Sequence, residues 1–374
     1  MTKIDINKKP FTEATMLKLD IFRRCFREWF PVFVYHPSVK QIFIYDMFAG
    51  SGTDSEGNPG SPIILLDEAH HYCQALAKNN KKYVVFGFNE KVKEKKESLN
   101  KAKDNFLQNC NSNCPLEECI FSKAIFCRDS SFEEVMKDER FGRILANKSY
   151  AKFILLDQYG FSQITEDVFL KLVISPLTDF IFFISSSFIK RFRDMKAVKA
   201  YIDTNKLDFE ETKPKECHRI IADYFRNLIP ADKEYYIHHF TIQKGTNYYG
   251  LIFGTSHSLG MEKFVKVCWI EDEKSGESNC NIDNDFEKGS LFYDPANTTK
   301  KIKIREELKL LILNRKIKSN IEGLKWVLSH GCEPKLFVDV ARSLVEQNKV
   351  TIEGKFNRQS SNIHRVEKYK IEVL

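Results

Sequence analysis

Apolar runs of strand length alternate with amphipathic segments over the first 190 residues of the chain. Apolar positions at spacings of three and four predict helices at 14–29, 63–78, 91–107, 132–138 and 166–174. Short apolar runs predict strands at 40–48, 83–88, 124–128, 151–156 and 179–184. Runs such as FILL and FIFFI lack polar alternation and must be covered on both faces, which favours a parallel sheet between two helical layers. Pro31 and Pro37 are expected to end the first helix.

A charged helical insertion at about 188–230 interrupts this rhythm. Two strands follow, at 235–243 and 248–254, joined by the hairpin-like turn Lys244-Gly245-Thr246-Asn247. Together, these strands and helices predict a doubly wound α/β domain with a reversed edge strand. Residues 271–299 are polar and predict a loop or linker, and helices at 305–317, 321–328 and 334–347 precede strands at 350–355 and 366–373. This tail predicts a winged-helix domain at 300–374 after a first domain at 1–299.

Composition describes an ordinary globular protein, with 43% hydrophobic and 29% charged residues in 374. No apolar stretch approaches the roughly 20 residues that span a bilayer, so we expect no membrane partner. The first ten residues lack an export signal, and ten scattered cysteines are expected to be reduced thiols in a cytoplasmic protein.

Positive charge is concentrated at the C-terminal end. Residues 300–374 hold 17 Lys and Arg against 9 Asp and Glu, whereas the preceding 299 residues are nearly neutral. This imbalance favours nucleic acid as a partner of the C-terminal region. A solvated lysine-rich surface is the alternative interpretation.

The sharpest local signal is a glycine-rich sequence, DMFAGSG, at the end of the first strand. It places Asp46, Phe48, Ala49, Gly50 and Gly52 at the edge where doubly wound sheets bind ligands. The dinucleotide fingerprint fails at Ser55, and the phosphate-binding P-loop fails at Asn58-Pro59. An acidic residue leading into F-A-G-S-G is the form used by S-adenosylmethionine enzymes, which makes S-adenosyl-L-methionine the expected cofactor. A glycine-rich turn without a ligand is the alternative.

Acidic residues follow the next three strands of the predicted sheet. Glu90 is placed to accept the ribose hydroxyls of a nucleoside, and Asp129 to accept an adenine amino group. Asp157 and Tyr159 are the predicted catalytic residues, the first accepting the amino hydrogens of a nucleobase and the second stacking on its ring. Solvated carboxylates, a helix N-terminal acid at Asp157 and core packing of Tyr159 are the alternatives.

No metal site is expected from the cysteines or histidines. Cys110, Cys114, Cys119 and Cys127 lack the paired spacing of zinc knuckles, so free thiols are the expectation. His257 follows the last strand and is the histidine best placed to face a pocket. Together with Lys18 and Ser61 it completes the set of candidates for substrate binding.

Four motifs resemble the three-Cys-motif partner protein family. They are D-x-F-A-G-S-G, P-G-S-P-I-I-L-L at 59–66, L-L-D-Q-Y-G, and L-I-F-G-T-S-H-S-L-G, within roughly 15–269. The resemblance implies a class I methyltransferase-like domain that binds S-adenosylmethionine around Asp46, Gly50, Gly52, Glu90 and Asp129. The F-A-G-S-G and P-G-S-P pair is also similar to a bacterial ribosomal RNA adenine-N6 methyltransferase. Adenine-N6 enzymes usually carry D-P-P-Y, whereas this chain has D-Q-Y-G, with Gln158 in place of a proline.

The sequence therefore predicts an S-adenosylmethionine-dependent methyltransferase that modifies a nucleobase amino group in DNA or RNA. Two further hypotheses remain open. The first is a non-catalytic partner protein that binds nucleic acid on a methyltransferase-like scaffold, with a protein partner of its own. The second is a methyltransferase acting on a small molecule or a protein.

Overall fold

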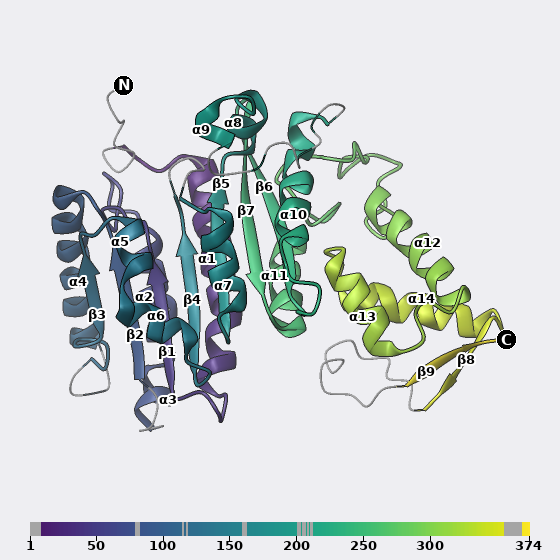
Figure 1. The fold of residues 1–374 in the computed structure, drawn as a ribbon, viewed down its shortest axis with the longest axis horizontal. Coiled ribbons are helices and arrows are strands. Elements are labelled where there is room, and N and C mark those ends of the chain that lie inside the picture. The colour runs from purple at the N-terminus through teal and green to yellow at the C-terminus, as the bar shows by residue number, and fades with distance from the viewer. Residues whose placement is uncertain are drawn as a thin grey trace.

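The computed structural model describes residues 9–78, 83–113, 116, 119–158, 163–199, 203, 207, 209, 212–354 and 369–374 (Figure 1). Tyr159, Cys114 and residues 366–368 of the predicted 366–373 strand lie outside the described residues.

The described residues form a central sheet of seven strands in the order β3-β2-β1-β4-β5-β7-β6. The strands are β1 (Gln41–Asp46), β2 (Tyr83–Asn89), β3 (Ile125–Arg128), β4 (Tyr150–Leu156), β5 (Thr178–Ile184), β6 (Tyr236–Lys244) and β7 (Asn247–Thr255). The pairs from β3 to β5 are parallel, and β7 is antiparallel to both of its neighbours. The predicted doubly wound α/β sheet is confirmed.

The reversed strand was predicted at the edge of the sheet, and this detail is wrong. Phe182 of β5 pairs with Ile252 of β7, and His239 of β6 pairs with the same residue from the other side. The reversed strand β7 is therefore inserted next to β5, and β6 forms the edge. A hairpin pattern fixes that two strands pair, but it does not fix which of the two meets a third strand.

Helices cover both faces of the sheet, because its strands are apolar on both. One face packs against α1 (Glu13–Val34), α2 (Ser61–His70), α3 (Cys73–Lys78), α4 (Lys93–Asn113) and α11 (Ser258–Glu271). The other packs against α5 (Phe132–Lys137), α6 (Glu139–Ala146), α7 (Glu166–Ile174) and α10 (Cys217–Asn227). Along β4, Phe153 and Leu155 face the first layer, whereas Ile154 and Leu156 face the second.

The first helix continues through Pro31 to Val34, so the expected break at Pro31 is wrong. Phe30 and Val34 are fully buried, and their packing outweighs the backbone hydrogen bond that a proline removes. Arg23 and Arg27 bind the buried carboxylate of Glu68 on α2 at 2.8–2.9 Å. These contacts fix α1 against the sheet and determine where its N-terminal half lies.

A C-terminal unit lies beside β6 and α11 in Figure 1. It consists of α12 (Thr299–Leu313), α13 (Asn320–Ser329), α14 (Pro334–Glu346), β8 (Val350–Glu353) and β9 (Lys370–Val373), the two strands being antiparallel. The indole N–H of Trp269 donates to the carbonyl of Gly331 at 2.9 Å. One continuous apolar core joins this unit to the first helical layer. Among the described helices, none is long and apolar enough to cross a membrane.

Candidate functional site

The carboxyl ends of the parallel strands meet at one edge of the sheet, which we call the carboxyl edge. Asp46 ends β1 there and is fully buried. Its Oδ2 accepts a hydrogen bond from the Ser61 hydroxyl at 2.6 Å, and its Oδ1 accepts one from the Phe48 N–H at 3.1 Å. Burial raises the pKa of Asp46 to about 7, and the nearby Asp157 carboxylate adds to this rise. Asp46 thus holds the start of α2 and the glycine-rich loop together.

The sequence Ser61-Pro62 predicts an N-cap at Ser61 with proline at the first helical position. Gly60 is the N-cap instead, and Ser61 is the first residue of α2. The Ser61 hydroxyl donates to the buried carboxyl group of Asp46 and does not cap the helix.

The loop 49–60 follows β1 and folds back on itself. Gly50 and Gly52 have φ angles of 62° and 82°, in the left-handed region that favours glycine. A Cβ at Gly52 would lie 3.0 Å from Ala102 Cβ and 3.1 Å from Leu99 Cδ1 of α4. The carbonyl of Gly52 accepts from the Gly60 N–H at 2.8 Å, which closes the loop. Gly52 is therefore required both for its backbone conformation and for close packing.

Asp54 organises the tip of this loop, a role that sequence reasoning missed. Its carboxylate accepts hydrogen bonds from the Phe11, Glu56 and Asn58 N–H groups at 2.8–2.9 Å, and from the Asn58 side-chain amide at 2.9 Å. These bonds hold the pKa of Asp54 below its ordinary value against the opposing effect of desolvation. The signal was present in the turn-forming sequence Asp54-Ser55-Glu56-Gly57-Asn58.

Glu90 follows β2 and joins the glycine-rich loop directly. Its Oε2 accepts from the Gly50 N–H at 3.0 Å, and its Oε1 accepts from the Val92 N–H at 2.8 Å. Asn89, which sequence reasoning also missed, donates to the carbonyls of Met47 and Ser130 at 3.3 and 3.0 Å. The loops after β1, β2 and β3 are thereby fixed relative to one another.

Asp129 lies in the loop after β3, with 52% of its side chain exposed. The ammonium of Lys96 on α4 forms a hydrogen bond with it at 3.0 Å and lowers the pKa of Asp129. The carboxylate thus lies at the predicted strand end, close to solvent.

Lys18 and Asp157 meet at the carboxyl edge although 139 residues separate them. The Lys18 ammonium forms an ion pair with Asp157 Oδ2 and lies 4.9 Å from the centre of the Phe183 ring on β5. The two side chains are 12% and 19% exposed, so the pair is partly buried at the edge. Asp157 Oδ1 accepts no hydrogen bond from the described residues.

Gln158 has a structural role that accounts for the departure from D-P-P-Y. Its side chain is buried, donates from Nε2 to the Phe183 carbonyl at 3.0 Å, and accepts at Oε1 from the Gln163 N–H at 2.8 Å. The glutamine therefore ties the end of β4 to the end of β5, next to Asp157. Tyr159, which the sequence predicts as the catalytic partner of Asp157, lies outside the described residues.

His257 does not face the carboxyl edge, contrary to expectation. Because β7 is antiparallel, its end at Thr255 lies beside the start of β5. The His257 Nδ1 accepts from the Leu259 N–H at 3.0 Å and caps α11. The physical reason is the strand reversal, which moves residues after β7 to the opposite edge of the sheet.

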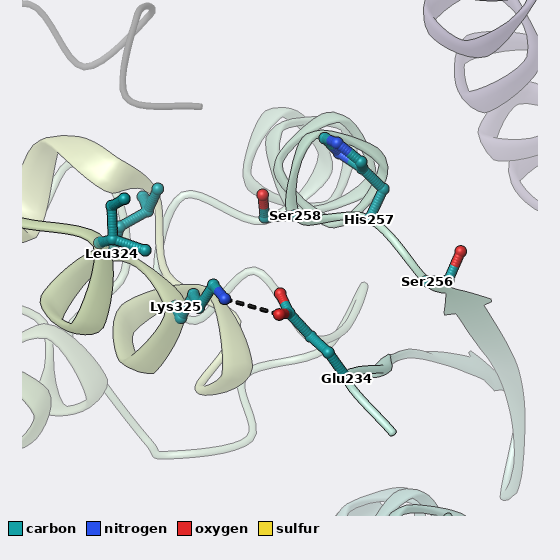
Figure 2. A pocket seen from close by; sticks show the side chains of 7 residues that line it. Glu234, Ser256, His257, Ser258, Leu324 and Lys325 are labelled. Carbon is teal, nitrogen blue, oxygen red and sulfur yellow. Dashed lines mark hydrogen bonds and ion pairs between the residues drawn. The ribbon is translucent and has the colours of Figure 1, made fainter. Parts of the chain in front are cut away.

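Figure 2 shows the shallow cavity that His257 lines, between the sheet and α13. Its volume is about 360 Å³, and the Lys325 ammonium reaches across it to Glu234 at 2.6 Å. Its lining residues are Glu234, Ser256, His257, Ser258, Ile321, Leu324 and Lys325.

The cysteines were considered as metal ligands and predicted to be free. The sulfur atoms of Cys110 and Cys119 are 3.8 Å apart, and both residues are buried free thiols. In the described part of the chain, no group of three or more His, Cys, Asp or Glu side chains has the arrangement of a metal site.

No family model matches this chain, and no curated protein matches it. Among solved structures, Trm1 from Pyrococcus horikoshii in complex with S-adenosyl-L-methionine is 12% identical, over 97% of this chain and 91% of that one, with a TM-score of 0.34. TrmK of M. capricolum, in complex with S-adenosyl-homocysteine, is 12% identical over 81% and 93%, with a TM-score of 0.25. The human methyltransferase 10 domain containing protein is 14% identical over 63% and 82%, with a TM-score of 0.30. The assignment of the fold rests on the order and direction of the strands in the sheet itself.

Proposed function

We propose that this chain is an S-adenosylmethionine-dependent methyltransferase that modifies a nucleobase amino group in DNA or RNA. The carrying observation is the Asp157 carboxylate at the end of β4, beside the glycine-rich loop after β1, whose Oδ1 accepts no hydrogen bond from the described part of the chain. In open α/β sheets, this edge is the usual place for a ligand.

The residues of the carboxyl edge fit the cofactor. The positive φ angles of Gly50 and Gly52 and the absence of a Cβ let the backbone approach a ligand closely. Glu90 and Asp129 supply carboxylate acceptors at successive strand ends, for the ribose hydroxyls and the adenine amino group. Phe48 and Ala49 would complete the set of residues that contact the cofactor. Asp46 is buried and holds the loop through its hydrogen bonds with Phe48 and Ser61. When bound, the cofactor supplies an electrophilic methyl group on its sulfonium.

Asp157 would orient the acceptor. Its Oδ1 would accept an amino hydrogen of the target base, which localises the nitrogen lone pair for attack. Lys18 fixes the carboxylate through Oδ2, so that little reorganisation is needed on substrate binding. Catalysis would then consist of positioning and electrostatics, without a covalent enzyme intermediate. Stacking of the base on Tyr159 stays a prediction from the sequence.

We propose further that the C-terminal unit is a winged-helix domain that contacts nucleic acid. The support is its three helices with a two-stranded antiparallel sheet, together with 17 basic against 9 acidic residues from Lys300 onward. As part of the same proposal, the two domains divide at residue 299, the chain is a member of the three-Cys-motif partner family, and it binds a protein partner.

A non-catalytic, nucleic-acid-binding scaffold is the second candidate function. Two observations favour it, the departure from D-P-P-Y and the ion pair with Lys18 that occupies one oxygen of Asp157.

Calorimetric titration with S-adenosylmethionine and, separately, with S-adenosylhomocysteine tests the enzyme proposal. We expect binding in the micromolar range. Glu90→Ala is expected to weaken it at least tenfold, because the substitution removes a ribose acceptor and releases the Gly50 N–H. The matched control is Glu97→Ala, which removes an exposed glutamate of neighbouring α4. Absence of binding for both ligands would overturn the proposal and leave the scaffold function.

A further inference from the structure

Two short helices extend the carboxyl edge beyond β5. The chain passes directly from β5 into α8 (Ser186–Arg191), which α9 (Lys196–Lys199) follows, and both lie above that edge in Figure 1. The hydroxyls of Ser186 and Ser187 donate to the Tyr248 carbonyl at 3.1 Å, and the Tyr248 N–H donates to Ser187 at 2.6 Å. Ile189 is fully buried beneath them. The segment is therefore fixed to the sheet.

This segment begins next to the candidate site. Phe183 lies three residues before α8. Its backbone carbonyl accepts the hydrogen bond from Gln158, and its ring lies beneath the Lys18 ammonium. Lys18 in turn is paired with Asp157. A strand of nucleic acid whose base reaches Asp157 would thus pass close to α8.

The charge of the segment is strongly positive. Residues 186–199 contain five basic side chains and one acidic side chain, Asp194. Lys190 donates to the Thr212 carbonyl, and Arg193 and Lys199 lie 3.8 and 3.7 Å from Asp194. Arg191, Lys196 and Lys199 are exposed. Because exposed ion pairs at such distances are weak, the segment keeps a surplus of positive charge at its surface.

Exposed apolar groups lie among these cations. The side chains of Phe188 and Met195 are 39% and 50% exposed. The Phe188 ring packs against Phe192 with its centre 4.5 Å away, which supports it from one side. Cations interleaved with an exposed aromatic ring are the combination that binds unpaired nucleic acid, with phosphates on the cations and a base stacked on the ring.

The C-terminal unit lies elsewhere. Its contact with the sheet includes the pair between Lys325 and Glu234, and Glu234 precedes the start of β6. Since β6 runs parallel to β5, this contact is at the edge opposite Asp157. Lys325 is therefore poorly placed to hold the nucleotides that flank a target base, and Lys300 is buried against Glu277.

We infer that α8 and α9 form the surface that holds the phosphates of the acceptor strand beside the target base. The surface consists of Phe188, Arg191, Arg193, Met195, Lys196 and Lys199, and its partner is a single-stranded or locally unpaired stretch of DNA or RNA. The inference rests on the proposed function, because it takes Asp157 as the position of the target base. It makes the insertion a substrate-binding element and assigns the C-terminal unit to more distant contacts.

A charge-matched pair of variants tests this inference. The first combines Arg191→Gln, Lys196→Gln and Lys199→Gln, and the control combines Lys303→Gln, Lys316→Gln and Lys335→Gln, three exposed residues of the C-terminal unit. The probes are fluorescein-labelled single-stranded 20-mers of RNA and DNA, and anisotropy is followed from about 50 to 300 mM KCl. Each phosphate contact contributes roughly 0.7 to the slope of log affinity against log salt on a single strand.

We expect the α8–α9 variant to lose at least tenfold in affinity at low salt and about 2 in salt slope. The control should change both much less, and Phe188→Ala should lower affinity about tenfold with an unchanged slope. Equal losses in the two triple variants, or none in the α8–α9 variant, would overturn the inference. So would the absence of oligonucleotide binding by the wild-type chain.

Calorimetry with S-adenosylhomocysteine and a thermal melt accompany each variant. Cofactor binding with unaltered oligonucleotide affinity in the α8–α9 variant rejects the inference and leaves the proposed function standing. Conversely, selective loss of oligonucleotide binding in a chain that binds no cofactor supports the surface and rejects the enzyme.

Discussion

Two lysine–carboxylate pairs in different parts of the molecule differ in what surrounds them. Lys18 and Asp157 pair at the carboxyl edge, whereas Lys300 and Glu277 pair at 2.6 Å where the C-terminal unit meets the sheet. The second pair is almost fully buried, at 7% and 8% exposure, and the first is more open, at 12% and 19%.

The buried pair has its polar atoms occupied. Glu277 also binds the Arg219 Nε at 2.7 Å, and Lys300 also donates to the carbonyls of Ser275 and Gly331 at 2.8 and 3.3 Å. Burial alone would raise the pKa of Glu277, but Lys300, His239 and Arg219 hold it well below its usual range. Asp157 has a single partner among the described residues. A buried pair whose polar atoms all have partners stabilises the junction between the C-terminal unit and the sheet. At Asp157, whose Oδ1 accepts no hydrogen bond from the described residues, we expect the carboxylate to bind a ligand.

Substitution of Asp157 tests the functional side of this comparison and has the largest expected effect. We expect Asp157→Ala to lower methyl transfer to a nucleic-acid acceptor by about 10²-fold or more, because the amino group loses its acceptor. Affinity for S-adenosylhomocysteine should remain nearly unchanged, since Asp157 does not hold the loop after β1. The measurements are a radiolabelled methyl-transfer assay and calorimetry. Parallel loss of transfer and cofactor affinity would contradict the assigned role.

Substitution of Glu277 tests the structural side. Glu277→Gln leaves the Lys300 ammonium buried without a counter-charge, and we expect a loss of about 3–5 kcal/mol in the free energy of unfolding. Urea unfolding followed by tryptophan fluorescence measures it. The control is Glu234→Gln, which breaks the exposed pair with Lys325 and should cost about 0–1 kcal/mol. If the two variants cost the same, burial does not distinguish these pairs.

The glycine-rich loop allows a finer test of the carboxyl edge. Gly52 and Gly57 have nearly equal φ angles of 82° and 84°, but an added Cβ meets α4 only at Gly52. Gly57→Ala should therefore cost about 1 kcal/mol of backbone strain, and Gly52→Ala about 1–3 kcal/mol with weaker binding of S-adenosylhomocysteine. Thermal unfolding and calorimetry measure these changes. Equal effects at both glycines would show that contact with α4 is unimportant.

The layers of the sheet could be predicted from the sequence, and the hydrogen bonds of the site could not. Continuous apolar runs locate β4 and β5 within one residue, because a strand buried on both faces leaves no room for polar alternation. The loop after β1 and Glu90 were found from glycine spacing and from the position of strand ends. The pairing of Lys18 with Asp157 depends on how α1 docks, which Arg23, Arg27 and Glu68 determine through contacts distant in sequence.

Three of the features that the sequence did not indicate share one physical origin. Which strands become neighbours decides three features: the position of β7 between β5 and β6, the position of His257 at the opposite edge, and the structural role of Gln158. Local patterns describe one strand and its exposed face, whereas neighbour choice is decided by packing across the whole sheet. The apolar pattern placed Asp157 at the end of the fourth strand, where the structure has it, without indicating that Gln158 would bridge to β5.

The two regions should also differ in their response to pH, and this is the smallest expected effect. Asp46 has a pKa raised to about 7, so the folded state holds a proton that the unfolded state has already lost above about pH 4. The free energy of unfolding should fall as pH rises, by about 1 kcal/mol from Asp46 between pH 6 and 7.5. Glu277 stays charged over this range and adds no slope, because its pKa is lowered. Asp46→Asn should flatten the dependence in urea unfolding at the two pH values, and an unaltered slope would mean that Asp46 does not titrate there.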